Sequence, residues 1–368
     1  HRQGRHDPIM TFAFAAAGTG GHLVPAIAVA RELVRRGVPA SDIVFFGGER
    51  LETTAVPEAG FDLVRLDIRG LRRSLSLRNV GLPLMIRRAA RTVKDNLNGR
   101  GRGVLTAFGG YVTIPAGLGA SSAGYPIVIH EQNAVPGLAN RVATRRAART
   151  LVAFPATVPR LIGAELTGNP LAEPIAAYDP NLRSDAIAGY GLDSERTVLG
   201  VFGGSQGAAA LNEQVVGFAS RIVDSGYAIL HVTGPANHDA VAVRATDNPQ
   251  WVTVPFEGHM ERFYAASDLV LSRAGALTIS ELTATGTPAV VVPLPAGRGY
   301  QGENASEMEA AGGCVIVDQD EVSALPTLLA ELLADRERRN RMAAAAATVG
   351  RPAATATVTD IVLEVANA

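Results

Sequence analysis

Three polar stretches of this sequence carry side chains that could bind an anion or move a proton, and each follows a short apolar run. The first, Gly18-Thr19-Gly20-Gly21-His22, ends a glycine-rich loop with a histidine. The second is His130-Glu131-Gln132-Asn133, and the third joins Arg273 to Glu281 through small residues. Histidine and glutamate are common general acids and bases, and a glycine-rich loop that leads into a helix presents N–H groups to an anion. These stretches are therefore the candidates for binding and catalysis.

The stretch from Ser272 to Leu282 predicts a diphosphate site. An apolar strand, Asp268–Leu271, precedes it, and apolar residues follow at helical spacing. The start of such a helix leaves N–H groups unpaired at the positive end of its dipole, and small residues let a ligand approach the backbone. Glu281 lies too far along the helix to cap it, and its carboxylate suits hydrogen bonds from a ribose diol. The alternative is an ordinary strand-to-helix turn with a solvated Glu281.

The glycine-rich loop at residues 17–22 predicts a second ligand site. Residues 11–16 before it have the composition of a buried strand, and residues 25–33 predict a helix with Pro25 in its first turn. No Gly-Lys-Ser/Thr follows, which excludes a P-loop, and the Gly-x-Gly-x-x-Gly spacing of a dinucleotide site is absent. The loop therefore favours an anion or another polar ligand over a dinucleotide.

The elements around these stretches alternate between strands and helices, which is typical of a parallel, doubly wound α/β sheet. Ligands of such sheets lie beyond the carboxyl ends of the strands, where the three polar stretches occur. Composition predicts helices over residues 321–349 and 359–365. Short apolar runs predict strands at residues 11–16, 43–46, 104–108, 126–129, 197–202, 229–232, 252–256, 268–271 and 289–292.

Residues 197–208 repeat the arrangement at the start of the chain, a strand followed by a glycine-rich loop. We therefore predict two similar α/β domains that face each other across a cleft. The stretch from Leu166 to Pro180 is the predicted linker. We expect an N-terminal domain over residues 9–168, a C-terminal domain over residues 169–352, a last helix over residues 353–368 that packs back on the first domain, and an expression remnant at residues 1–8.

Composition narrows the class of protein. The chain has 368 residues, of which 47% are hydrophobic, enough for two packed domains. The single cysteine, Cys314, rules out a disulfide framework and a cysteine-built metal site, and it favours a reducing, cytoplasmic setting. No apolar run reaches the length of a membrane span, and no signal peptide is recognisable.

Charge is divided unevenly along the chain. Residues 1–195 contain 23 Lys and Arg against 16 Asp and Glu, whereas residues 196–368 contain 11 against 19. Residues 69–94 have no acid and mix apolar side chains with cations, a composition that suits an anionic membrane surface. The alternative is a helix that packs on the core and turns a cationic face to solvent. The cations expected at the membrane are Arg69, Arg72, Arg73, Arg87 and Arg88.

Five short motifs occur in order along nearly the whole chain. They are Gly18–His22, His130–Asn133, Thr167–Pro170, Gly203–Gly207 and Gly275–Glu281. Together they resemble the bacterial N-acetylglucosaminyltransferases that convert lipid I to lipid II in peptidoglycan synthesis. The resemblance implies the GT-B fold, two Rossmann-like domains with the active site between them. It also implies an inverting, metal-independent transfer by a peripheral enzyme on the cytoplasmic face of the cell membrane.

The resemblance implies a donor site for UDP-N-acetylglucosamine in the second domain, without a cofactor or a nucleic acid. The diphosphate would be held by Ser205, Gln206, Arg273 and the backbone of Ala276, Leu277 and Thr278. The other donor residues would be Glu281 at the ribose, Phe256 and Glu257 at the uracil, and Gln301 and Asn304 at the sugar.

The acceptor, lipid I, is assigned by the same resemblance to the first domain. Its residues would be Thr19, Gly20, Gly21, Tyr111 and Asn133. An inverting transfer needs a base for the attacking C4 hydroxyl of the acceptor sugar. His22, with a reference pKa of about 6.5, and Glu131 are the two candidates, and His22 could instead only position the acceptor. The helix start after Arg273 would stabilise the departing UDP.

Two positions depart from the family pattern. Ala17 stands where a glycine is usual, which matters only if that position needs a positive φ. Ala172 stands where an arginine is common, so that arginine's contribution is missing or supplied elsewhere. Asp318-Gln319-Asp320 superficially matches a metal-binding Asp-x-Asp motif. We interpret it as a surface turn, because a helix start binds a diphosphate without a metal.

Two other functions fit the same architecture. One is an enzyme similar to UDP-N-acetylglucosamine 2-epimerase, and the other is a non-enzymatic membrane scaffold that binds a nucleotide sugar. The acid-free stretch at residues 69–94 favours the transferase, because an epimerase has no need of it. Release of UDP that depends on lipid I would distinguish the transferase from both.

Overall fold

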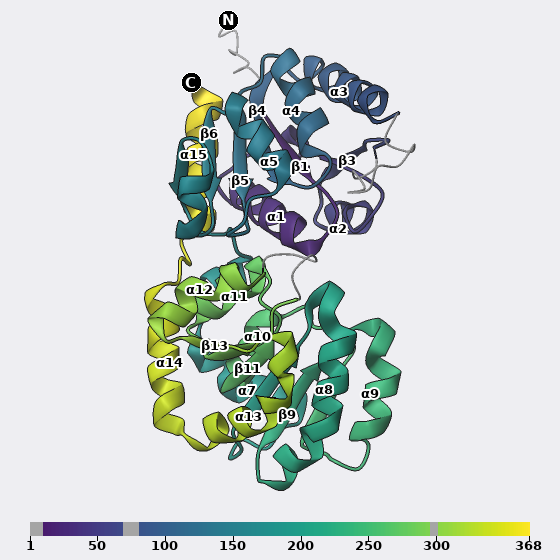
Figure 1. The fold of residues 1–368 in the computed structure, drawn as a ribbon. Coiled ribbons are helices and arrows are strands. Elements are labelled where there is room, and N and C mark those ends of the chain that lie inside the picture. The colour runs from purple at the N-terminus through teal and green to yellow at the C-terminus, as the bar shows by residue number, and fades with distance from the viewer. Residues whose placement is uncertain (1–9, 69–80, 295–300) are drawn as a thin grey trace, which may run out of the picture. The chain divides into compact units, whose positions relative to one another are not determined.

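The computed structural model describes residues 10–68, 81–294 and 301–368, with residues 205–208 described by their backbone alone. The chain divides into two compact units. Unit 1 comprises the chain up to Ala172 together with Ala353–Ala368, and unit 2 comprises Glu173–Pro352. Each unit is a parallel sheet with helices on it (Figure 1), which confirms the predicted α/β fold class. The division falls after Ala172, whereas the sequence predicts a boundary after Gly168.

The sheet of unit 1 has seven strands in the order β3-β2-β1-β4-β5-β6-β7, all parallel. The strands are β1 Met10–Ala16, β2 Ile43–Gly47, β3 Asp62–Arg65, β4 Arg102–Gly109, β5 Ile127–Glu131, β6 Arg149–Val152 and β7 Ala164–Leu166. The α-helices are α1 Gly20–Arg35, α2 Glu52–Glu58, α3 Leu82–Asn98, α4 Thr113–Ser122, α5 Leu138–Ala143 and α15 Ala354–Asn367. Short 3-10 segments are Ala40–Asp42, Thr144–Arg146 and Pro155–Arg160.

Side chains of β1 alternate between two cores, one on each face of the sheet. Phe12 and Phe14 pack with residues of α1 and α15. Ala13 and Ala15 pack with residues of α3 and α4. Because both faces are covered, nearly every residue of β1 is buried, which is why the strand is a continuous apolar run in the sequence.

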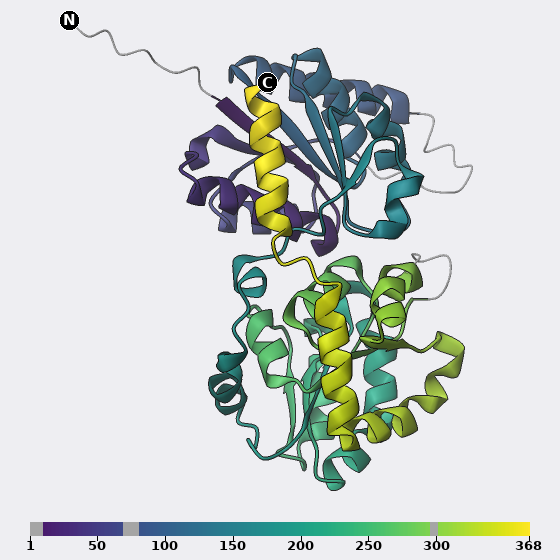
Figure 2. The ribbon, with the colours of Figure 1, turned by 90° about the vertical axis from the view of Figure 1, so that its left-hand side faces the viewer.

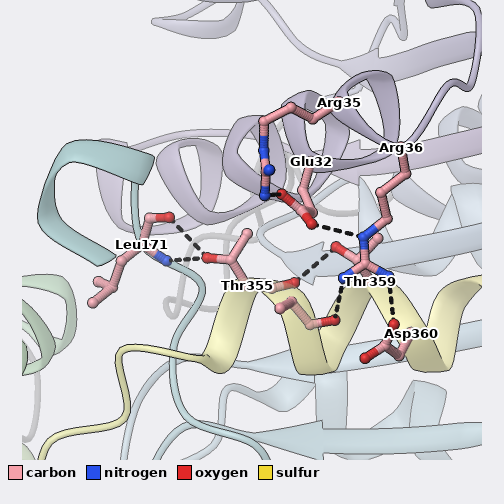
Figure 3. A network of polar contacts seen from close by, with 8 residues as sticks. Glu32, Arg35, Arg36, Leu171, Thr355, Thr359 and Asp360 are labelled. Carbon is pink, nitrogen blue, oxygen red and sulfur yellow. Dashed lines mark hydrogen bonds and ion pairs between the residues drawn. The ribbon is translucent and has the colours of Figure 1, made fainter. Parts of the chain in front are cut away.

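Helix α15 brings the end of the chain back to unit 1. It packs on α1 and β4 and lies, in yellow, in front of the strands in Figure 2. Arg36, which follows the last residue of α1, forms ion pairs with Glu32 and Asp360. The Thr355 hydroxyl accepts a hydrogen bond from the Leu171 N–H and donates one to the Leu171 carbonyl, both at 2.8 Å (Figure 3). Thr355 therefore links the segment that leaves unit 1 to the segment that returns.

The sheet of unit 2 has six strands in the order β10-β9-β8-β11-β12-β13, again all parallel. The strands are β8 Val198–Phe202, β9 Ala228–Val232, β10 Trp251–Val254, β11 Leu269–Ser272, β12 Ala289–Val291 and β13 Cys314–Ile316. The α-helices are α6 Glu173–Ala176, α7 Arg183–Tyr190, α8 Gly204–Asp224, α9 His238–Ala245, α10 Met260–Ala266, α11 Ala276–Thr285, α12 Gln301–Ala311, α13 Leu325–Ala334 and α14 Arg336–Thr348. Short 3-10 segments are Pro180–Leu182, Pro235–Asn237 and Gln319–Ala324.

In each sheet, successive strands of the chain are added first on one side and then on the other side of the starting strand. This change of side lies between β1 and β4 in unit 1 and between β8 and β11 in unit 2. Doubly wound sheets bind ligands beyond the carboxyl ends of the strands at such a point. The loops that leave β1, β4, β8 and β11 are those that contain the glycine-rich motifs and the Arg273 stretch. The topology therefore locates a candidate site in each unit.

Several elements differ from the sequence prediction in extent. Helix α1 begins at Gly20, so Pro25 lies in its second turn and not in its first. Helix α15 begins at Ala354, one residue after the start of the last helix that the sequence predicts over residues 353–368. Strands β3, β6, β7 and β13 are not among the predicted strand ranges. They have three or four residues and lie at or near the edges of their sheets, where so short a run gives little periodic signal.

Candidate functional site

The first glycine-rich loop connects β1 to α1 in unit 1. Gly18 has φ +106°, a conformation that favours glycine. The Thr19 carbonyl accepts hydrogen bonds from the N–H groups of His22 and Leu23, while the Thr19 side chain makes no capping bond. Ala17 does not have a positive φ, so alanine fits where the family pattern has glycine. The loop thus presents a helix start whose first residues, Gly20 and Gly21, carry no side chains.

The His22 side chain lies against Gly109 at the end of β4. A Cβ atom at Gly109 would lie 2.8 Å from His22 Cδ2 and 3.0 Å from Nε2, so the ring depends on glycine there. Burial lowers the pKa of His22, and the charge of Glu131 and the backbone of Ala17 offset part of this effect. The imidazole is therefore neutral near pH 7, which is the form that can accept a proton.

Glu131 accepts four hydrogen bonds within its own loop. Its Oε1 accepts from the Asn133 N–H at 3.0 Å and the Asn133 Nδ2 at 3.3 Å. Its Oε2 accepts from the Gly137 N–H and from Asn140 Nδ2, both at 2.9 Å. The buried carboxylate therefore organises residues 131–140 into a fixed loop, and each oxygen is already engaged by two donors.

His130, next to Glu131, has a structural environment. Its Nε2 lies 2.9 Å from the Gly168 carbonyl and its Nδ1 lies 3.0 Å from Gln132 Nε2. These partners require a neutral ring that donates through Nε2 and accepts at Nδ1. Burial lowers the pKa of His130 to about 4, with partial offset from the Gly168 carbonyl. His130 therefore joins β5 to the segment at Gly168.

Unit 1 brings together the predicted acceptor-side residues. Thr19 and His22 follow β1, Tyr111 follows β4, and Glu131 and Asn133 lie at the end of β5. These three strands are neighbours in the sheet, in the order β1-β4-β5. Because all strands are parallel, their carboxyl ends lie at one edge. Residues far apart in sequence therefore lie at one edge of the sheet of unit 1.

In unit 2, two helix starts follow the strands that flank the reversal of strand order. Helix α8 begins at Gly204, directly after β8; the side chains of Ser205 and Gln206 lie outside the described residues. Helix α11 begins at Ala276, after Gly275 with φ −64° and ψ 146° and no side-chain cap. Its first turn comprises Ala276, Leu277 and Thr278, whose N–H groups have no acceptor within the helix. This is the geometry of an anion site at a helix start.

Glu281 lies inside α11 and is buried, with 9% of its side chain exposed. The Tyr264 hydroxyl donates a hydrogen bond of 2.8 Å to Glu281 Oε2. Burial raises the pKa of Glu281 to about 7, although the Tyr264 hydroxyl lowers it in part. Glu281 is therefore not the solvated residue of an ordinary turn, and its carboxyl group titrates near neutral pH.

Arg273 is buried, and its hydrogen bonds connect the end of β12 to a neighbouring turn. Its Nη1 donates to the Val292 carbonyl at 3.0 Å and to Gln319 Oε1 at 2.8 Å. Gln319 is the middle residue of the Asp-x-Asp sequence, so that sequence contributes a structural contact to the fold. Among the described residues, no group of three or more His, Cys, Asp or Glu side chains could hold a metal ion.

The other predicted donor residues have varied surroundings. Asn304 Nδ2 donates to the Ala274 carbonyl at 3.1 Å, and Gln301 Oε1 accepts from the Leu294 N–H at 3.1 Å, so α12 is tied to the loops after β11 and β12. Phe256 is 72% exposed. Glu257 accepts hydrogen bonds from the Tyr190 hydroxyl and from the His259 N–H. The Phe256 ring is therefore open to solvent, whereas the Glu257 carboxylate already accepts hydrogen bonds from two residues of unit 2.

Sequence reasoning missed four residues that shape these sites. Glu52, Gly109 and Asn140 contact the loops of unit 1, and Tyr264 contacts Glu281 in unit 2. Each acts on a residue at least nine positions away, which no local motif reports. The sequence contained one indication for Glu52. It lies a few residues after the glycine pair Gly47-Gly48, which ends an apolar strand.

Comparisons with known proteins cover both units. The model of the glycosyltransferase family 28 N-terminal domain matches residues 12–152. The model of the glycosyltransferase family 28 C-terminal domain matches residues 198–360. The first match includes strands β1 to β6 of unit 1, and the second includes all six strands of the unit 2 sheet.

Similar relatives carry one activity name, UDP-N-acetylglucosamine–N-acetylmuramyl-(pentapeptide) pyrophosphoryl-undecaprenol N-acetylglucosamine transferase. The chain is 41% identical to that of Acidothermus cellulolyticus, covering 98% of this chain and 99% of the relative. It is 40% identical to that of Rhodococcus erythropolis, covering 96% and 93%. A crystal structure of Acinetobacter baumannii MurG is 29% identical with a TM-score of 0.75, covering 96% of this chain and 99% of that one.

In the part of the chain that the structure describes, no helix is long and apolar enough to cross a membrane.

Proposed function

The chain belongs to glycosyltransferase family 28, and on that basis we propose that it transfers N-acetylglucosamine from UDP-N-acetylglucosamine to lipid I, the undecaprenyl-linked MurNAc-pentapeptide, and so makes lipid II. The observation that carries this proposal is identity of about 40% over nearly the full length of relatives with that activity name. The family matches include strands of both units, so the resemblance is not confined to one nucleotide-binding motif.

The donor is assigned to unit 2. The start of α11 supports this assignment, because uncapped N–H groups and a helix dipole attract a diphosphate. Glu281 lies one turn further along α11, where a ribose would follow the diphosphate, and its buried carboxylate can accept from two hydroxyls. Arg273 supports the loop through its contacts with β12, and its expected role at the diphosphate remains part of the proposal.

The acceptor is assigned to unit 1, with His22 as the general base. Its lowered pKa keeps the ring neutral near pH 7, so it can take the proton of the acceptor's C4 hydroxyl as that oxygen attacks the anomeric carbon. The bond from the anomeric carbon to the UDP oxygen breaks in the same step, with inversion. Glu131 is the weaker candidate, because four donors already occupy its oxygens. Charge on the departing UDP would be stabilised by the α11 start without a metal.

The test is acceptor-dependent release of UDP. The protein is mixed with UDP-N-acetylglucosamine with and without lipid I, and both UDP and lipid II are measured. A transferase releases UDP and makes lipid II only when lipid I is present. Release of UDP without lipid I would favour the epimerase-like alternative, and no turnover in either sample would favour a binding protein.

We also propose that unit 1 binds the cytoplasmic face of the bacterial cell membrane. Support comes from α3, which packs on α4 through the buried side chains of Ala89, Val93 and Leu97. The opposite side of α3 exposes cations next to Leu84, which is 55% exposed. The exposed cations of α3 are Arg87, Arg88, Arg91 and Lys94. The other three expected membrane cations, Arg69, Arg72 and Arg73, lie outside the described residues.

Vesicles that contain anionic lipid test this part of the proposal. Arg87→Glu with Arg88→Glu should reduce co-sedimentation by about tenfold or more, since each surface cation contributes about 1 kcal/mol. Adding Arg72→Glu and Arg73→Glu should abolish the remaining binding. The matched control is Arg336→Glu with Arg341→Glu, the same charge change at exposed positions of α14 in unit 2. Equal losses in both variants would refute a surface specific to α3.

A further inference from the structure

A buried carboxylate outside the predicted site connects three of the loops that form it. Glu52 is the first residue of α2 and its side chain is fully buried, at 0% exposed. A buried acid at the ligand-binding edge of a sheet needs hydrogen-bond donors, because burial without them disfavours the charge. The groups that donate hydrogen bonds to Glu52 therefore indicate its role.

The donors of Glu52 come from the loops after β1, β2 and β4. Its Oε2 accepts from the Gly18 N–H at 3.2 Å. Its Oε1 accepts from the Gly48 N–H at 2.8 Å and from the Tyr111 hydroxyl at 3.3 Å. Gly18 belongs to the loop of Thr19 and His22, and Tyr111 is itself an expected acceptor residue. One side chain therefore contacts two separate parts of the proposed acceptor site.

The surrounding backbone is shaped to let this carboxylate in. A Cβ atom at Gly47 would lie 2.8 Å from Glu52 Cγ, and one at Gly48 would lie 1.8 Å from the Tyr111 hydroxyl oxygen. Neither position has room for a side chain, so the two glycines allow Glu52 and Tyr111 to meet above β2. The contact is thus built into the packing of the three loops.

Glu52 is held in its ionised form. Burial raises the pKa of its carboxyl group, but backbone N–H donors, including those of Gly18 and Gly48, lower it by more, and the net pKa lies below its usual value. The ionised group only accepts hydrogen bonds, and each oxygen faces at least one N–H donor. A glutamine in its place would turn an NH2 group toward one of these donors in either orientation.

We propose that Glu52 is a positioning residue for the transfer reaction. It fixes the backbone at Gly18, four residues before His22, and the hydroxyl of Tyr111 in one arrangement. The His22 base and the acceptor contacts therefore keep their relative positions through the Glu52 carboxylate. This inference rests on the proposed function, and it concerns unit 1 alone.

The experiment compares Glu52→Gln with Glu58→Gln, a matched change at an exposed position of the same helix. Glu52→Gln should lower kcat by about 10- to 150-fold, the value of one lost hydrogen bond to a charged group. The KM for UDP-N-acetylglucosamine should stay within about twofold, since the donor is assigned to unit 2. Glu58→Gln should leave both constants unchanged. Glu52→Asp, which keeps the charge on a shorter side chain, should recover part of kcat.

Hydrogen exchange provides a readout that does not depend on activity. Without any substrate, peptides that contain Gly18 and Gly48 should exchange faster in Glu52→Gln than in Glu58→Gln, because both amides lose their acceptor. Unchanged kcat in a folded Glu52→Gln protein would overturn the proposal, as would unchanged exchange at both glycines. If Glu52→Gln does not fold, Glu52→Asp carries the same comparison. Failure of the wild type to make lipid II would instead refute the proposed function, and the exchange result would still decide whether Glu52 holds the loops.

Discussion

Two buried glutamates, Glu52 in unit 1 and Glu281 in unit 2, lie near loops that we propose bind ligands, but their pKa values are shifted in opposite directions. Glu52 receives hydrogen bonds from Gly18, Gly48 and Tyr111, and its pKa lies below the usual value. Glu281 receives one from Tyr264, and burial raises its pKa to about 7. Burial acts in the same direction on both carboxyl groups. At Glu52 the backbone donors outweigh the effect of burial, whereas at Glu281 the Tyr264 hydroxyl offsets only part of it.

The difference indicates a difference in role. The loops of unit 1 supply donors to both oxygens of Glu52, so it can hold structure without a ligand. Among the described residues, the side-chain donor to Glu281 is the Tyr264 hydroxyl, at Oε2. Two ribose hydroxyls would supply to Glu281 the donors that Glu52 obtains from its own loops. We therefore expect Glu281 to reach its most stable charged state when a nucleotide is bound.

The largest expected effect is a loss of kcat from a change in unit 1 that leaves UDP binding by unit 2 nearly unchanged. His22→Ala should lower kcat by about 100-fold or more, the loss typical of a missing general base, while affinity for UDP, assigned to unit 2, stays nearly constant. In the wild type, the acid limb of kcat/KM should lie below pH 6.5, because burial lowers the pKa of His22. Kinetics against pH and UDP titration by calorimetry measure both. An equal loss of UDP affinity would place His22 at the donor.

Glu281→Ala should weaken UDP binding by roughly 10- to 150-fold, from the loss of hydrogen bonds to a charged group. A 2′,3′-dideoxyribose analogue, which lacks the donors, should be barely affected. Ribose donors favour the carboxylate, so binding should release a proton near pH 7, and wild-type affinity should weaken by up to about tenfold between pH 7 and pH 6. Glu281→Gln should remove this pH dependence. Equal losses for both ligands would assign Glu281 to the fold.

One substitution, Glu→Gln, should have opposite effects on stability at the two positions. At pH 8, Glu281→Gln should raise the free energy of unfolding by about 3 kcal/mol, since a carboxyl with a folded pKa of about 7 loses stability as pH rises from 4.5 to 7. Glu52→Gln should lower it by about 1.5–3 kcal/mol. The Glu52 contribution is present above pH 4.5 and lost as pH falls through its lowered folded pKa.

Unfolding by denaturant at pH 5 and pH 8 measures the free energy of unfolding of both variants, Glu52→Gln and Glu281→Gln. The matched controls are the exposed residues Glu58 in unit 1 and Glu331 in unit 2, each changed to Gln, where the expected change is within about 0.5 kcal/mol. Destabilisation of both buried variants at pH 8 would mean that the hydrogen bonds to the two carboxyl groups do not explain their opposite pKa shifts.

The smallest expected effect comes from a neutral contact in unit 1. Thr355→Val removes two hydrogen bonds to Leu171 (Figure 3) and should cost about 1–2 kcal/mol. Because no partner titrates, this cost should be the same at pH 5 and pH 8, unlike that of either glutamate. Thr357→Val, at an exposed position of α15, is the control. A cost that varies with pH would connect Thr355 to the charged pairs of Arg36 and Asp360.

Local features of the sequence predict the fold class and the positions of the loops. Continuous apolar runs such as residues 11–16 predict strands buried on both faces, and Gly18 and Gly275 mark turns into helices. These features are local, because they depend on side-chain periodicity and on backbone freedom. The order of five short motifs was enough to indicate the family, and the matches to both family models agree.

The environment of the polar side chains depends on contacts between elements that are far apart in the sequence. Glu52 meets Gly18 and Tyr111, which are 34 and 59 residues away in sequence. Glu281 meets Tyr264 from another helix, and Arg273 turns to the end of β12. Charge and hydrogen bonding depend on donors and burial supplied by several elements at once. A motif names the residue that could do chemistry, but its partners in space determine its protonation state and hence what it can do.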